Sequence, residues 1–122
     1  MRTPIEEMPV IMNTPEVKVR GAEWGGMAAS YMRFAEGVDF APLTEGLPDN
    51  MCQCPHWGYV LRGRMRVRYA GGKEEVLEAG QAFHMPAGHT AVCEEEIAYV
   101  EFSPTKEMNE ALNHVAGKFS RQ

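Results

Sequence analysis

The sequence predicts an all-β domain, an antiparallel β-barrel or sandwich that ends in one α-helix. Short runs of β-branched and aromatic residues alternate with polar ones, and glycine- or proline-containing turns separate these runs. Helical spacing of apolar residues is confined to the end of the chain. With 122 residues, the chain has the size of one compact domain.

About eight short strands follow from this pattern. Residues 64–69 are a clear case, because arginines alternate there with apolar side chains between the turn signals Arg62-Gly63 and Gly71-Gly72. Residues 21–26 are expected to form a turn. The expected strands span residues 17–20, 27–34, 51–61, 64–69, 75–77, 81–85, 89–93 and 97–102.

The strands define a barrel over residues 17–102, flanked by two different ends. Residues 1–16 carry three prolines and are expected to form an N-terminal arm that lies over the body or a neighbour. Residues 103–122 are expected to form the C-terminal helix and tail, with Ser103 as N-cap and Pro104 at the first helical position. Four apolar residues then recur at helical spacing: Met108, Ala111, Leu112 and Val115.

Composition excludes several classes of partner. The formal net charge is −5 and the pI about 5.4, which argues against nucleic acid or an anionic membrane as the partner. The chain has neither a membrane-spanning apolar run nor a signal-peptide pattern, so a cytoplasmic location is expected. Three cysteines, an odd number, do not form a secreted disulfide framework.

Three residues at alternate positions, 52, 54 and 56, carry side chains that can bind a metal. In an extended backbone, Cys52, Cys54 and His56 face one way, whereas Trp57 and Tyr59 face the other. A straight strand would separate Cys52 from His56 by about 13 Å, at about 3.3 Å per residue, which is too far for one ion. Pro55 gives the backbone a reason to bend and bring the donors together.

Residues 59–67 and 80–89 resemble the two conserved motifs of the cupin superfamily of small β-barrels. Gly63, seven residues after His56, and Gly80 with Pro86-Ala87-Gly88 carry the likeness. The resemblance implies a jelly-roll barrel and a site location, but no reaction. The pattern Cys-x-Cys-Pro-His-Trp-Gly-Tyr narrows it to a group of small single-domain cupins of unassigned activity.

The candidate site departs from the cupin pattern. His56 stands at the position of the family's glutamate, and the two family histidines fall at Asn50 and Cys52. The histidine of the second motif falls at Ala91, while His89 lies two residues earlier on the same strand face. The resemblance therefore supports the fold more strongly than the ligand set.

We expect a metal site built from Cys52, Cys54, His56 and His89, with His84 as a substitute or supporting group. Thiolate and imidazole favour zinc, with iron(II) or copper(I) as alternatives. Plain burial of the cysteines, with hydrogen-bonded imidazoles, is the competing interpretation. A Cys52–Cys54 disulfide is a third, disfavoured by its strained small ring and the reducing setting.

Beside the metal we expect a mostly apolar pocket for a small, partly apolar organic molecule. Glu101 is the nearby acid that we expect to transfer protons. Three protein ligands plus water would indicate a metal-dependent enzyme, whereas four would indicate a structural or purely binding protein. The other expected pocket residues are Met51, Val60, Phe83, Met85 and Tyr99.

Surface features complete the expectations. Trp57 and Tyr59 should lie on the outside of the barrel and, with the N-terminal arm, predict a homodimer. The alternating arginines should face solvent and pair with Glu74 and Glu75 on the adjacent hairpin strand. These arginines are Arg62, Arg64, Arg66 and Arg68.

Overall fold

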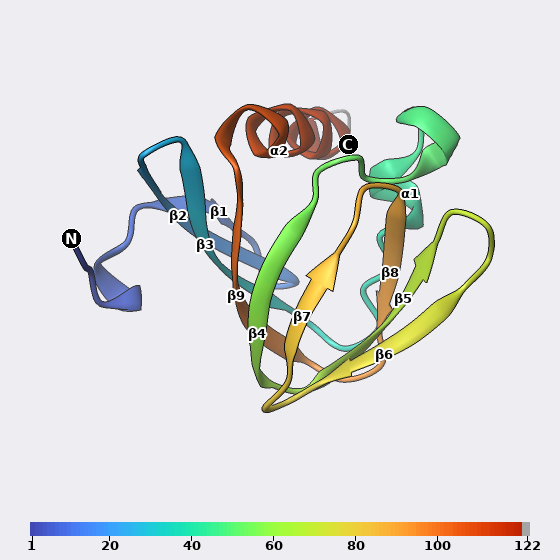
Figure 1. Cartoon of the computed structure of the whole chain (residues 1–122), viewed down its shortest axis with the longest axis horizontal. Coiled ribbons are helices and arrows are strands. Elements are labelled where there is room, and N and C mark those ends of the chain that lie inside the picture. Colours follow the sequence, from blue (N-terminus) through green and yellow to red (C-terminus); the bar gives the residue numbers. More distant parts are fainter. Residues whose placement is uncertain (121–122) are drawn as a thin grey trace.

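Two antiparallel sheets face each other in the computed structural model, which describes residues 1–120 (Figure 1). This confirms the expected all-β jelly-roll architecture with one long C-terminal helix. The larger sheet has the strand order β1-β2-β3-β9-β4-β7, and the smaller one the order β6-β5-β8.

Nine strands make up the two sheets. In the larger sheet these are β1 (Val10–Asn13), β2 (Val17–Trp24), β3 (Met27–Phe34), β9 (Ile97–Pro104), β4 (His56–Arg62) and β7 (Ala82–Met85). The smaller sheet holds β6 (Glu74–Glu78), β5 (Arg64–Tyr69) and β8 (His89–Cys93). The helical segments are η1 (Ile5–Glu7), α1 (Ala41–Thr44), η2 (Pro48–Asn50) and α2 (Thr105–Ser120).

Several element bounds differ from the expected ones. β2 continues through Gly21 and turns only at Gly25, because Gly21 packs against Ile11, where a Cβ would come within 2.6 Å of the isoleucine Cδ1. β9 runs to Pro104, since Ser103 pairs with Ala28 in the β3 ladder and so does not cap the helix. Part of the N-terminal segment joins the larger sheet as its edge strand β1.

The expected strand over residues 51–61 is much shorter, which matters for the site. η2 occupies residues 48–50, and β4 begins only at His56, directly after Pro55. Between them Cys52 makes a single antiparallel bridge to His89. The bend expected at Pro55 therefore separates β4 from a segment that pairs with the other sheet.

Arg62 at the end of β4, with Arg64 and Arg66 on β5, pairs with different acids from those expected. Glu94 lies 3.1 Å from the Nε atoms of both Arg64 and Arg66, and Glu96 lies 3.4 Å from that of Arg62. β8 flanks β5 on the side opposite β6, so the turn after β8 brings these glutamates to the arginines. Glu74 and Glu75 do not form ion pairs with them among the described residues.

α1 and α2 lie together at one end of the barrel (Figure 1). The ring of His114 on α2 is bound through Nε2 to the carbonyl of Glu45, directly after α1, at 2.8 Å. Within residues 1–120, no helix is long and apolar enough to cross a membrane.

Candidate metal centre and its cavity

Three donor side chains from distant parts of the chain meet between the two sheets. Cys52 lies in the segment before β4, His56 is the first residue of β4, and His89 is the first residue of β8. One donor atom from each lies within 4.8 Å of the other two. The Cys52 amide donates to the His89 carbonyl at 2.8 Å, so the backbone holds two of the three together.

The hydrogen bonds of the two imidazoles leave the same ring nitrogen for the group. His89 Nδ1–H donates to the Pro86 carbonyl at 2.8 Å, which places the lone pair of the neutral ring on Nε2. His56 Nδ1 lies 2.7 Å from Ser103 Oγ, and His56 Nε2 lies 3.9 Å from Cys52 Sγ. Such outer hydrogen bonds typically orient metal-binding histidines.

Burial keeps the three donors uncharged in the absence of a cation. It lowers the pKa of His56 to about 3, with a further contribution from His89, and also lowers the pKa of His89. Burial raises the pKa of the Cys52 thiol to about 11. Neutral imidazoles are ready ligands, whereas the thiol needs a nearby cation to become a thiolate.

Glu101 lies against this group from β9 and is 2% exposed. Its Oε2 is 3.3 Å from His56 Nδ1, and its Oε1 has no hydrogen-bond partner within the described residues. Burial raises the pKa of Glu101 to about 8, so the contact with His56 joins two neutral groups near pH 7. An unpartnered buried carboxyl oxygen is costly and typical of a functional site.

Ser103 is a site residue that the sequence analysis does not predict, because a serine followed by proline is typical of a helix N-cap. It is fully buried and bonds His56. The available signal was the alternation of Tyr99, Glu101 and Ser103 along one strand face.

Cys54 does not join the donor group. Its Sγ lies 3.5 Å from the Pro55 carbonyl, and the residue lines a separate pocket beside Glu107 of α2. Residues 53–55 do not belong to a strand, so the alternation that would have aligned Cys52 with Cys54 is absent. All three cysteines are free, so the structure contains no Cys52–Cys54 disulfide.

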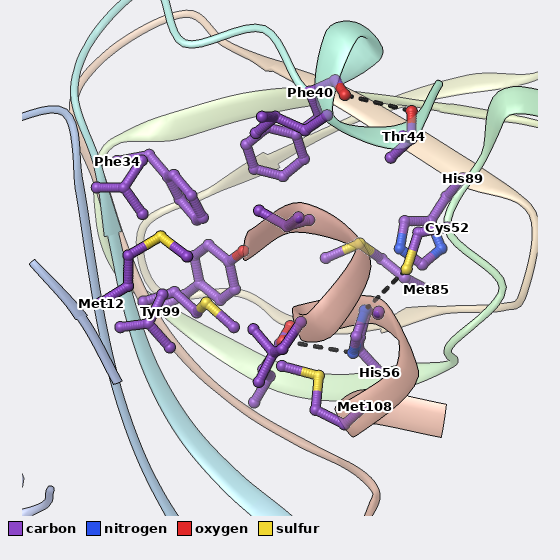
Figure 2. Close-up of a pocket in the computed structure, with 18 of the residues that line it drawn as sticks. Met12, Phe34, Phe40, Thr44, Cys52, His56, Met85, His89, Tyr99 and Met108 are labelled. Atoms are coloured by element: carbon purple, nitrogen blue, oxygen red, sulfur yellow. Dashed lines mark hydrogen bonds and ion pairs between the residues drawn. The ribbon is translucent and has the colours of Figure 1, made fainter. Parts of the chain in front are cut away.

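A cavity of about 100 Å³ extends from the donor group between the sheets and under the helices. Figure 2 shows Cys52, His56 and His89 on one side and Met12, Phe34 and Tyr99 on the other. Residues from β2, β3, α1 and α2 form much of a lining that strand alternation alone could not predict. The lining includes Val17, Val19, Met32, Phe40, Leu43, Thr44, Leu47, Met108, Ala111, Leu112 and Val115.

The expected pocket residues divide into two groups. Met85, Tyr99 and Glu101 line the cavity. Val60 and Phe83 are buried in the core without lining it, and Met51 is half-buried outside it.

His84 is a correction to the expected pocket. It is exposed on the outer face, where its ring stacks on Trp57 at 4.8 Å between centroids. Phe83 and Met85 occupy the inward positions of β7, so His84 between them must point outward.

The fold and the site thus define a jelly-roll barrel with a one-cysteine, two-histidine centre. Residues 52–97 match the profile of the Cupin domain family. No curated protein sequence matches the chain significantly. The matched segment includes the strands that hold His56 and His89, and the solved structures described next have a similar fold.

Solved structures of similar fold come from several proteins. An RmlC-like cupin from Shewanella frigidimarina is 21% identical, with a TM-score of 0.59 over 84% of this chain and 88% of that one. KdgF from a Halomonas species is 25% identical, with a TM-score of 0.57 over 81% and 90%. Ectoine synthase from P. lautus is 11% identical, with a TM-score of 0.62 over 85% and 77%. These likenesses establish the barrel and leave the reaction open.

Proposed function

We propose that the protein is a metal-dependent enzyme whose divalent ion, zinc, is held by Cys52, His56 and His89. The carrying observation is that these donors lie within 4.8 Å of one another while both imidazoles have Nδ1 engaged elsewhere. One thiolate and two imidazoles form a donor set that suits zinc. An ion with three protein ligands keeps a position at which it acts as a Lewis acid toward water or a substrate carbonyl.

Glu101 is the proton-transfer group of this proposal. Its carboxyl lines the cavity beside His56, and in the metal-free protein burial raises the pKa of Glu101 to about 8. A neutral buried carboxyl can donate a proton to bound substrate and take it back later. Ser103 serves as a positioning residue that fixes the ring of His56.

The Cys-x-Cys-Pro-His-Trp-Gly pattern then describes a variant of the cupin site. Its first cysteine and its histidine supply ligands, its proline makes the bend, and its tryptophan lies on the outer face. We propose that small cupins with this pattern share the three-donor centre. The second cysteine, Cys54, would not be a ligand.

Metal titration of the purified protein tests the assignment. After chelator treatment, we expect uptake of one zinc, and of one cobalt(II) with a thiolate-to-cobalt absorption band. Cys52→Ser and His89→Ala should abolish stoichiometric uptake. The matched variants Cys54→Ser and Cys93→Ser should preserve it. A band that is markedly weaker in Cys54→Ser than in the parent protein would show that Cys54 is a fourth ligand, and no uptake by any form would refute the proposal.

We also propose a homodimer formed through the outer face of the larger sheet. Trp57 and Phe102 are directly paired there, and both, like Tyr59, are more than 40% exposed. Large exposed apolar patches of this kind support self-association through a two-fold contact. The three free thiols support a reducing, cytoplasmic setting.

A further inference from the structure

We infer that the cavity takes a small molecule with one polar, metal-binding head and an uncharged apolar remainder, and that it rejects molecules with a second anionic group. The inference rests on the proposed function for the head group only. The preference for the remainder stands on the lining of the cavity.

The lining carries no cationic side chain that could pair with such an anion. Within residues 1–120, the cavity side chains include no lysine and no arginine. The acidic side chain among them is Glu101, which supplies no positive charge and lies beside His56, at the end of the cavity that the head group would occupy. Four arginines of the barrel are instead committed to glutamates outside, at distances of 2.8 to 3.4 Å.

The polar and apolar parts of the lining lie at opposite ends. Cys52, His56 and His89 form one end, and the wall around Phe34 forms the other (Figure 2). The ring of Phe34 lies 4.7 Å from that of Phe40 and 6.1 Å from that of Tyr99, between centroids. A ligand that places its head at the donors must therefore place its other end against aromatic and aliphatic carbon.

Desolvation decides against a charged tail. An unpaired carboxylate moved from water into an apolar cavity loses hydration that the cavity wall does not replace. An isopropyl group of the same shape gains by the same transfer. We therefore expect the molecule with a carboxylate tail to bind at least 100-fold more weakly than its apolar isostere.

The volume sets the size of the ligand. A cavity of about 100 Å³ accommodates roughly six to nine non-hydrogen atoms when its walls adjust slightly. Met12, Met32, Met85 and Met108 supply that adjustment, because methionine side chains are unbranched and flexible.

A matched pair of hydroxamic acids tests the inference by calorimetry. 4-Methylpentanohydroxamic acid and succinic monohydroxamic acid share the head and differ in an isopropyl or carboxylate end. Calorimetric titration measures the affinity of each compound for the zinc-loaded protein. Thermal shift measures how far each compound stabilises the metal-free protein. We expect the isopropyl compound to bind at least 100-fold more tightly to the loaded form and to be the better stabiliser of the metal-free form.

A positive charge placed on the cavity wall should reduce the preference for the isopropyl compound. Leu43 on α1 lines the cavity and is only half-buried, so Leu43→Lys can present an ammonium there. This substitution should reduce the ratio of the two affinities, isopropyl over carboxylate compound, at least tenfold. Val92→Lys adds the same charge to the exposed outer face of β8 and should leave the ratio unchanged.

The outcomes separate the two proposals. Failure to load any metal, with the isopropyl compound still preferred by the metal-free protein, overturns the proposed function and leaves this inference standing. Equal binding of both compounds to loaded protein overturns this inference alone. Binding of neither compound to either form also overturns it.

Discussion

Removing the hydroxyl of Ser103 should weaken metal binding without removing a ligand. Ser103 is 0% exposed, and its Oγ lies 2.7 Å from His56 Nδ1. After Ser103→Ala, the remaining polar neighbour of that nitrogen is Glu101 Oε2, at the longer distance of 3.3 Å. The ring of His56 would then be held less firmly, with Nε2 less well directed at the donor group.

The size of the effect follows from that one contact. A buried hydrogen bond contributes about 1 to 1.5 kcal/mol net, and loss of a bond that orients a metal-binding histidine costs about 10- to 100-fold in affinity. Because Glu101 retains part of the interaction, we expect a loss near the lower limit, about tenfold. The free energy of unfolding of the metal-free protein should fall by about 1 kcal/mol.

Competition with a chromophoric chelator measures the zinc affinity, and urea unfolding measures the stability. Ser30→Ala is the matched control, because it removes a buried serine hydroxyl from the neighbouring strand β3 and leaves His56 bonded to Ser103. Equal affinity losses in the two variants, or no loss in Ser103→Ala, would refute the positioning role.

Three further predictions concern a turn, the proposed dimer and the burial of Cys93. Gly63→Ala should lower the free energy of unfolding by about 2 to 4 kcal/mol, because φ is +81° there and a Cβ would collide with the Glu96 carbonyl. A decrease of less than about 1 kcal/mol in urea unfolding would contradict the turn geometry. Phe102→Glu should convert the proposed dimer to a monomer in light scattering, whereas Val92→Glu on the other sheet should not; an unchanged mass in both would argue against this face as the interface. Burial raises the pKa of the Cys93 thiol from an ordinary value of 9 to about 12. Iodoacetamide should therefore label Cys93 about a thousandfold more slowly in the folded than in the urea-unfolded protein at pH 8. Comparable labelling rates would show that Cys93 is not enclosed.

The sequence predicted strands best where glycines or prolines mark both ends. β3 and β5 have the expected bounds, because each lies between glycine-containing turns. The prediction was wrong for the segment before His56, because its composition is compatible with a strand. There η2 and Pro55 divert the chain into a bridge with β8, which only tertiary pairing determines.

For the site, alternation within a strand predicted facing but not neighbours. The convergence of His56 and His89 was expected, while Ser103 was not, because its contact with His56 depends on the pairing of β4 with β9. Cys54 illustrates the opposite error. Its position two residues from Cys52 implied a shared face only as long as the backbone stayed extended.

The positions of His56 and His89 have a mechanical consequence. His56 belongs to the larger sheet and His89 to the smaller one, 33 positions later in the chain. An ion bound by both would act as a staple between the two layers and close a long loop that is costly in entropy to close by packing alone. Resistance of the barrel to heat should then rise with the concentration of free metal, linking the integrity of the shell to the supply of the ion.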